Sequence, residues 1–238
     1  MKKIRLNQLD IFRGYAIILM MFYHFAYDLN MFGYIHANPN KDTLWQISRY
    51  IIVTIFLLSM GMSLKLLHKD NIRWDKVKKR ALILGGASVI VSISTYIEFP
   101  KSWVYFGILH FGFVGSLVAL FFINHPKLTI ITTIFIFIAS FSEIFRLHYL
   151  YIYLYKAHYI PQYTQDFLNM FPWFGVILFG VTLVNYSLHI KLFNLRIFKS
   201  KNRFNNILAF LGRHSLLVYL IHLPIIFGLF MAVRYVQY

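Results

Sequence analysis

Seven apolar windows, each about 20 residues long, constrain the fold of this chain more than any other feature of its sequence. They begin near Ile11, Leu44, Ala81, Trp103, Leu128, Phe167 and Ile207. A window of that length crosses the hydrocarbon core of a bilayer as an α-helix, because only the helix satisfies its backbone polar groups without water. The sequence therefore predicts an all-α fold, a polytopic membrane bundle of about seven transmembrane helices, with residues 1–238 as a single domain.

The composition supports a membrane protein over a soluble one. Hydrophobic residues make up 59% of the chain and charged residues 13%, whereas a soluble domain carries about 25% charged residues. There is no cysteine, so disulfides and thiolate chemistry are excluded. The net charge of +16 is not accompanied by a soluble basic domain or a nucleic-acid-binding motif. We therefore expect the lipid bilayer, and no nucleic acid, as a partner.

The basic residues are unevenly distributed between the two sides of the predicted bundle. Lys2, Lys3 and Arg5 precede the first window, and further clusters occupy residues 65–80 and 191–203. All of these positions fall on the same side if each window crosses the membrane once. Because cytoplasmic loops carry an excess of Lys and Arg, we expect a cytoplasmic N-terminus and an external C-terminus. The predicted location is a prokaryotic plasma membrane.

The first window holds ionisable residues where a bilayer makes them costly, and such residues usually mark a functional path. Asp10 and Asp28 are five helical turns apart, and Arg13 and His24 lie near the line that joins them. His24 and Asp28 are spaced i and i+4, so they can contact each other and form a general base. The same pair could instead be a structural hydrogen bond or half of a metal site.

A second polar face occurs in the last window. Ser215, Tyr219 and His222 follow at i, i+4 and i+7 and share one face of a helix. Arg213 stands near the start of that helix, where a guanidinium and free backbone N–H groups could hold a phosphate together. Tyr219 alone would more often be a core residue, but the whole face indicates a ligand path.

These segments resemble a known family, the transmembrane acyltransferases of the heparan-α-glucosaminide N-acetyltransferase type, in their small prokaryotic branch. The resemblance covers most of the chain and rests on five strings. They are LDIFRGYAIILMMFYHFAYDL at the start, FLLSMGMSLKLL, YFGILHFGFVG, FPWFGVILFG and LGRHSLLVYLIHLP near the end. The resemblance implies transfer of an acetyl group from cytoplasmic acetyl-CoA to an acceptor, usually a sugar, on the opposite side of the membrane.

The resemblance, together with helix spacing for His24 and Asp28 and thioester chemistry for His110, gives the candidate site residues of this chain. The donor-binding candidates are Asp10, Arg13, Gly14, His110, Arg213 and Ser215. The catalytic candidates are His36, His24, Asp28, Tyr219 and His222. By position, His36 is the nearest match to the active histidine of the lysosomal relative, which lacks the His24 and Asp28 pair. His36 and the buried pair therefore both stay open as the base.

The chemistry of a thioester donor suits these residue types. The protein must hold the phosphates of acetyl-CoA, take a proton from the acceptor and stabilise an oxyanion. Tyr219, Ser215 or His110 could do the last of these. Direct transfer and an acyl-histidine intermediate are both compatible with the sequence. We expect no metal.

Two other functions explain the same polar residues. A proton-coupled small-molecule transporter would use the polar stripe as its path, and a bis-histidine haem protein would use pairs among His24, His110, His214 and His222 as axial ligands. The sequence leaves open the acceptor, which could be a sugar or a glycolipid, the choice between N- and O-acylation, the acyl chain length and the oligomeric state, including a homodimer.

Overall fold

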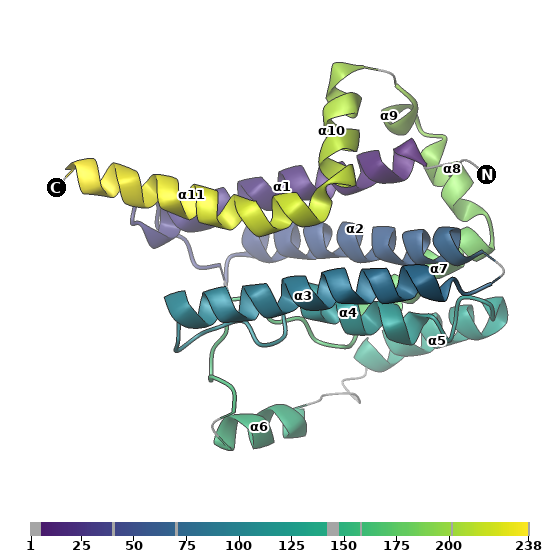
Figure 1. The fold of residues 1–238 in the computed structure, drawn as a ribbon, viewed down its shortest axis with the longest axis horizontal. Coiled ribbons are helices and arrows are strands. Elements are labelled where there is room, and N and C mark those ends of the chain that lie inside the picture. Colours follow the sequence, from purple (N-terminus) through teal and green to yellow (C-terminus); the bar gives the residue numbers. More distant parts are fainter. Residues whose placement is uncertain are drawn as a thin grey trace. The chain divides into compact units, whose positions relative to one another are not determined.

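A computed structural model describes residues 6–39, 41–69, 71–141, 148–157, 159–200 and 202–237 (Figure 1). Every helix or strand named within those residues is an α-helix, so the predicted all-α class is confirmed. The helices are α1 (Asn7–Met31), α2 (Thr43–His68), α3 (Trp74–Glu98), α4 (Ile108–Ala119), α5 (Pro126–Phe141), α6 (His148–Lys156), α7 (Trp173–Asn185), α8 (Leu188–Phe193), α9 (Arg196–Lys199), α10 (Arg203–Arg213) and α11 (Ser215–Gln237). The basic residues Lys2, Lys3 and Arg5 lie outside the described part of the chain.

Four helices, α1, α2, α3 and α11, are long and apolar enough to cross a bilayer, and the chain is an integral membrane protein. Three shorter apolar helices, α4, α5 and α7, coincide with the remaining predicted windows. A helix of 12 residues such as α4 is about 18 Å long, less than the hydrocarbon thickness of about 30 Å. The count of seven crossings therefore stays a prediction.

The start of the last predicted helix needs a correction. The predicted window from Ile207 contains Gly212, Arg213 and His214, and the structure divides it into α10 and α11 at His214. His214 has φ −105° and ψ 22°, which ends α10. The membrane-spanning helix begins at Ser215, eight residues later than the window suggested.

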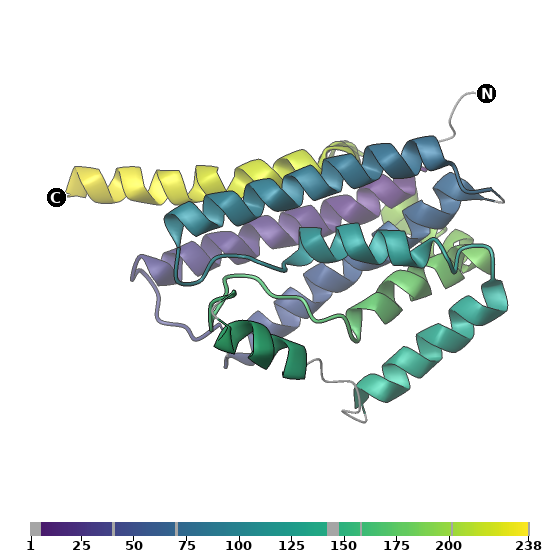
Figure 2. The same cartoon turned by 60° about the horizontal axis from the view of Figure 1, so that its bottom comes forward.

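The chain forms two compact units, and the first contains residues up to Ser59 together with residues from Ile190 onward. In this unit α1 and α11 lie side by side (Figures 1 and 2). The ring of His24 contacts the ring of His222, and Phe32, just after α1, contacts Phe227. Because the numbers rise together along both segments, the two helices run in the same direction.

Two glycines allow α10 to cross α1 at close range. A Cβ atom on Gly14 would collide with the backbone of Leu208, and one on Gly212 would collide with the backbone carbonyl of Asp10. Both motifs of the family resemblance thus meet at this crossing. The absent side chains are explained by helix packing alone.

The second unit comprises Met60–His189. Within it α3 packs on α4, and α7 packs on α4 and α5. Gly61 of α2 has the same role as Gly14 in the first unit, because a Cβ there would meet the backbone carbonyl of Ile177. Asp166 lies at the start of α4, where its Oδ2 accepts a hydrogen bond of 2.8 Å from the backbone N–H of Ile108. A carboxylate at this end also complements the helix dipole.

Candidate active site

The first cluster of predicted residues lies where α1 meets α2. Nη1 of Arg13 is 3.7 Å from Oδ1 of Asp10, whose side chain is buried. Nε of Arg13 donates to Oγ of Ser59 at 3.3 Å, and Nη2 donates to the Ser59 carbonyl at 3.4 Å. Arg13 is thus held between two helices at the end where α10 crosses. It ties α1 to α2, the structural role that ionisable residues in a membrane often have.

Ser59 is a residue that the sequence reasoning did not single out. Its hydroxyl donates to the carbonyl of Phe56 at 2.8 Å, so its oxygen accepts from Arg13. The signal was present, because Ser59 is a polar residue within the apolar string FLLSMG. Its i−3 hydrogen bond also shows why a serine fits a membrane helix without a separate partner.

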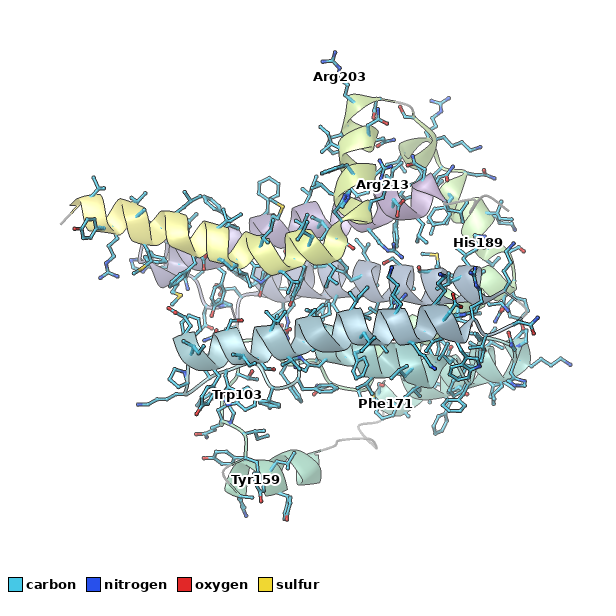
Figure 3. All side chains as sticks on the ribbon, viewed as in Figure 1. Trp103, Tyr159, Phe171, His189, Arg203 and Arg213 are labelled. Carbon is cyan, nitrogen blue, oxygen red and sulfur yellow. The ribbon has the colours of Figure 1, made fainter. Side chains whose placement is uncertain are left out.

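Arg213 is placed differently from Arg13. It ends α10, is exposed, and its Nε donates to the carbonyl of Ala209 at 3.1 Å (Figure 3). Ser215 begins α11, so the free N–H groups of the first turn of α11 lie within two residues of Arg213. The carbonyl of His214 accepts the first bond of that helix, from the N–H of Val218 at 3.0 Å. Arg213 thus lies two residues before the start of α11 but belongs to the end of α10, and phosphate binding at this joint stays a prediction.

An apolar cluster interrupts the polar stripe of α1. Ile17 and Met20 are buried against Ile52 of α2, and Tyr219 packs on this cluster from α11. Arg13 and His24 are separated by about 16 Å along the helix axis. The predicted polar face thus consists of two polar groups with an apolar layer between them.

The second polar group is a direct contact between His24 of α1 and His222 of α11. Nδ1 of His24 and Nε2 of His222 are 3.0 Å apart, and the ring centroids are 4.9 Å apart. His222 is buried and His24 is half-buried. The two residues are separated by 198 positions in sequence, so only the packing of α11 along α1 brings them together.

The surrounding carbonyls fix the proton positions in the neutral pair. Nδ1 of His222 is 2.7 Å from the Tyr219 carbonyl and 3.2 Å from the Val218 carbonyl, so it carries a proton and donates. Its Nε2 then accepts from Nδ1 of His24, which also donates to the Met20 carbonyl at 3.0 Å. Nε2 of His24 is left with its lone pair and has no hydrogen-bond partner within the described residues. It is the basic nitrogen of the pair.

The predicted contact between His24 and Asp28 is wrong. Asp28 is buried, with 4% of its surface exposed, but Oδ2 has no hydrogen-bond partner and no hydrogen bond joins it to His24. Nδ1 of His24 is used by His222 and Met20 instead, and Nε2, which carries no proton in this arrangement, cannot donate to a carboxylate. Spacing at i and i+4 permits a contact but does not select it over a partner from another helix.

His36 lies after α1 in a segment that is neither helix nor strand, and it is exposed. The segment is held near the end of α1 by Asn30, whose Oδ1 accepts from the N–H of Ala37 at 2.7 Å. No hydrogen bond joins His36 to another described residue. It is not brought into contact with His24 or His222.

His110 belongs to the second unit, where both of its ring nitrogens are occupied. Oγ of Ser92 donates to the Val104 carbonyl at 2.7 Å and accepts from Nε2 of His110 at 2.9 Å. Nδ1 of His110 accepts from the backbone N–H of Gly107 at 3.3 Å. These bonds hold the segment before α4 against α3, so the environment of His110 is that of a structural residue.

No group of three or more potential metal-binding side chains occurs in the described part of the chain. The 3.0 Å separation of the His24 and His222 nitrogens is that of a direct hydrogen bond.

A protein family matches most of the chain. The family described as heparan-alpha-glucosaminide N-acetyltransferase, catalytic, matches residues 5–224. This range includes α1 and most of the site, with Arg213, Tyr219 and His222 near its end. No curated protein and no solved structure matches the chain.

Proposed function

Because the chain belongs to the heparan-alpha-glucosaminide N-acetyltransferase catalytic family, we propose that it moves an acetyl group from cytoplasmic acetyl-CoA to an acceptor on the opposite membrane face. The acceptor is a sugar or a similar compound, including a glycolipid. The membrane is a prokaryotic plasma membrane.

The observation that carries this proposal is the meeting of the two family motifs within one unit. Asp10, Arg13 and Gly14 lie at the crossing with α10, next to Gly212. Farther along α1, His24 contacts His222 of α11. The same helix, α1, thus carries a charged group for an anionic donor at Arg13 and, closer to its C-terminal end, a basic nitrogen for proton removal at His24.

In this proposal Arg213 binds the acetyl-CoA donor directly, and Arg13 contributes positive charge near the same crossing of α1 and α10. Arg213 is exposed and uses Nε on its own helix, so its terminal N–H groups face outward for a phosphate of acetyl-CoA. Arg13 is already bonded to Asp10 and Ser59, and its contribution to the donor is the fixed positive charge. The buried apolar layer of Ile17 and Met20 separates this donor end from His24 along α1.

The base in this proposal is Nε2 of His24. It takes a proton from the amine or hydroxyl of the acceptor while that atom attacks the thioester carbonyl. The C–S bond breaks, and the CoA thiolate leaves and is protonated from His24. His222 orients His24 by accepting its Nδ1 proton, and Tyr219 fixes His222 through its carbonyl. His36, in the exposed segment after α1, is the competing candidate for the base or for an acyl carrier.

The test is acetyl transfer in sealed vesicles that contain the purified protein. Radiolabelled acetyl-CoA is supplied on the side of the N-terminus and glucosamine, as the acceptor probe, on the other side. We expect labelled glucosamine to form in vesicles that contain the protein and not in protein-free vesicles. Mass spectrometry of envelope glycans and lipids from cells with and without the protein identifies the natural acceptor. If no envelope component changes its acetylation and acetyl-CoA does not bind, the proposed activity is wrong.

A further inference from the structure

Helix α10 differs from the membrane-spanning helices in length and in pattern. Its 11 residues make it about 16 Å long, roughly half the thickness of the hydrocarbon core. It therefore cannot span a bilayer. In Figure 1 it runs across the direction of α1 and α11, the two long helices of its own unit. If α1 and α11 cross the membrane, α10 lies along the membrane surface.

One face of α10 is already used within the protein. Leu208, Ala209 and Gly212 are buried, and Leu208 and Gly212 touch the backbone of α1. Asn205 is buried as well and donates to the carbonyls of Ile197 and Ser200. These bonds fix α10 to the segment that precedes it, so α9 and α10 form one rigid piece.

A second face of α10 is apolar but exposed. Phe204, Ile207 and Phe210 have 51%, 55% and 56% of their surface exposed. At 100° per residue these three side chains occupy a continuous arc beside the buried face, whereas Asn206 and Arg213 lie on the remaining arc. Such a helix has a core-facing side, an apolar side that stays more than half exposed although Phe204 contacts Tyr15 of α1, and a polar side.

The residues around this apolar arc are basic. Arg196 and Lys199 of α9 and Arg203 of α10 are exposed, and none has an acidic partner within the described residues. Arg203 projects beyond the end of α10 (Figure 3). Two more exposed apolar residues, Leu195 and Ile197, lie on either side of Arg196 in the sequence. The sequence has no Asp or Glu from residue 167 to its end, so this segment contributes basic charges and no acidic ones.

We propose that α9 and α10 form an in-plane element that binds the anionic surface of the bilayer. Phe204, Ile207 and Phe210 insert at the boundary between headgroups and acyl chains, and Arg196, Lys199 and Arg203 pair with anionic headgroups. An amphipathic helix with basic residues beside a large apolar face is the type that lies in a membrane interface. Negative lipid headgroups attract such basic segments on the cytoplasmic side. This inference does not rest on the proposed enzymatic activity.

The chain contains no cysteine, so single cysteines can report on this face without background. Ile207→Cys and the adjacent Asn206→Cys are each spin-labelled in the full-length protein. The two proteins are reconstituted into vesicles of phosphatidylcholine with or without phosphatidylglycerol. Electron paramagnetic resonance then compares the accessibility of each label to oxygen, which enters lipid, and to a water-soluble nickel chelate.

We expect the oxygen-to-nickel accessibility ratio at residue 207 to be several-fold higher than at residue 206, and to rise when phosphatidylglycerol is added. In Arg196→Gln/Lys199→Gln/Arg203→Gln, that rise at residue 207 should be lost. Equal, water-exposed ratios at both positions in both lipids would overturn the proposal. Broadening of the residue 207 spectrum by spin–spin coupling would also overturn it, because a second copy of the chain would then cover the face. If the oxygen-to-nickel ratio at residue 207 of the unsubstituted protein does not change when phosphatidylglycerol is added, the proposed role of Arg196, Lys199 and Arg203 is refuted.

Discussion

At the scale of single residues, the decisive feature is the ordered pair of imidazoles. A histidine acts as a base only if the correct nitrogen is free, and its other nitrogen usually fixes which one that is. Here His222 and the Met20 carbonyl both engage Nδ1 of His24. Nε2 is therefore oriented without help from Asp28. Oδ2 of Asp28 is buried and has no hydrogen-bond partner in the described part of the chain.

Replacing the residues of this pair should separate the base from its positioning partner. We expect His24→Ala to lower kcat by about 10²- to 10⁴-fold, the usual effect of losing a general base. His222→Leu removes the acceptor for Nδ1 of His24 and should lower kcat less. His222→Gln offers a carbonyl oxygen in its place and should retain more activity than His222→Leu. The measurement is acetyl transfer to glucosamine, with acetyl-CoA binding as the control for folding.

His36 is the competing candidate for the base, and its replacement tests the prediction for His24. Because it is exposed and makes no hydrogen bond among the described residues, its removal should leave the packing of α1 unchanged. If His36→Ala abolishes transfer while His24→Ala keeps most of it, the base is His36 and the buried pair is structural. Near-normal transfer in both variants would exclude His24 and His36 as the base.

The donor site gives a second prediction at the same scale. Arg213→Ala should weaken acetyl-CoA binding by about 1.5 kcal/mol, the lower end for hydrogen bonds to charged groups, because this arginine is exposed to solvent. That loss corresponds to roughly a tenfold rise in Kd. Arg234→Ala is the matched control, since Arg234 is an exposed arginine in the last turn of α11. Equal affinities for both variants in equilibrium binding would remove Arg213 from the donor site.

At the scale of helices, the crossing of α1 and α10 depends on the absence of side chains at Gly14 and Gly212. Gly14→Ala places a methyl group against the Leu208 backbone, which cannot rotate away, so α10 must shift. We expect a loss of about 1–3 kcal/mol in stability, the usual cost of overpacking. The measurement is thermal unfolding in detergent, followed by tryptophan fluorescence.

Gly228→Ala is the control for this substitution. Gly228 lies inside α11, in the same unit, and a Cβ there would meet nothing within 4 Å. Its replacement should leave the unfolding temperature unchanged or raise it slightly, because alanine favours a helix. Equal effects at both positions would mean that the α1–α10 crossing does not require glycine.

A comparison of the predicted windows with the observed helices shows how far the sequence could predict the structure. The hydrophobic windows located every long apolar helix described by the structure, because the length and composition of a segment are properties of its local sequence. The break at His214 was not predicted, because no proline marks it and Gly212 lies within α10 as a packing residue. The His24–His222 contact was not predicted either, since it joins positions 198 residues apart. Local spacing favoured Asp28 instead, and only tertiary packing decided between the two partners.

At the scale of the whole molecule, the parallel direction of α1 and α11 restricts the number of membrane crossings. Successive crossings alternate in direction. If only α1, α2, α3 and α11 crossed, α11 would be the fourth crossing and would run opposite to α1. The observed contacts of His24 with His222 and of Phe32 with Phe227 show the same direction for both. The shorter helices α4, α5 and α7 must therefore add an odd number of crossings, and three of them give the seven that the sequence predicts.

This parity predicts that the two termini lie on opposite sides of the membrane. The basic residues of α3 and of the loop around Asn71 set the orientation, with the N-terminus in the cytoplasm. A reporter enzyme that is active only outside the cytoplasm should be active when fused to the C-terminus and inactive when inserted beside Asn71. A reporter that is active only in the cytoplasm should give the reverse pattern, which controls for expression. Termini on the same side would mean that an even number of the short helices cross. Arg213 and the first turn of α11 would then lose the cytoplasmic position that a CoA donor requires.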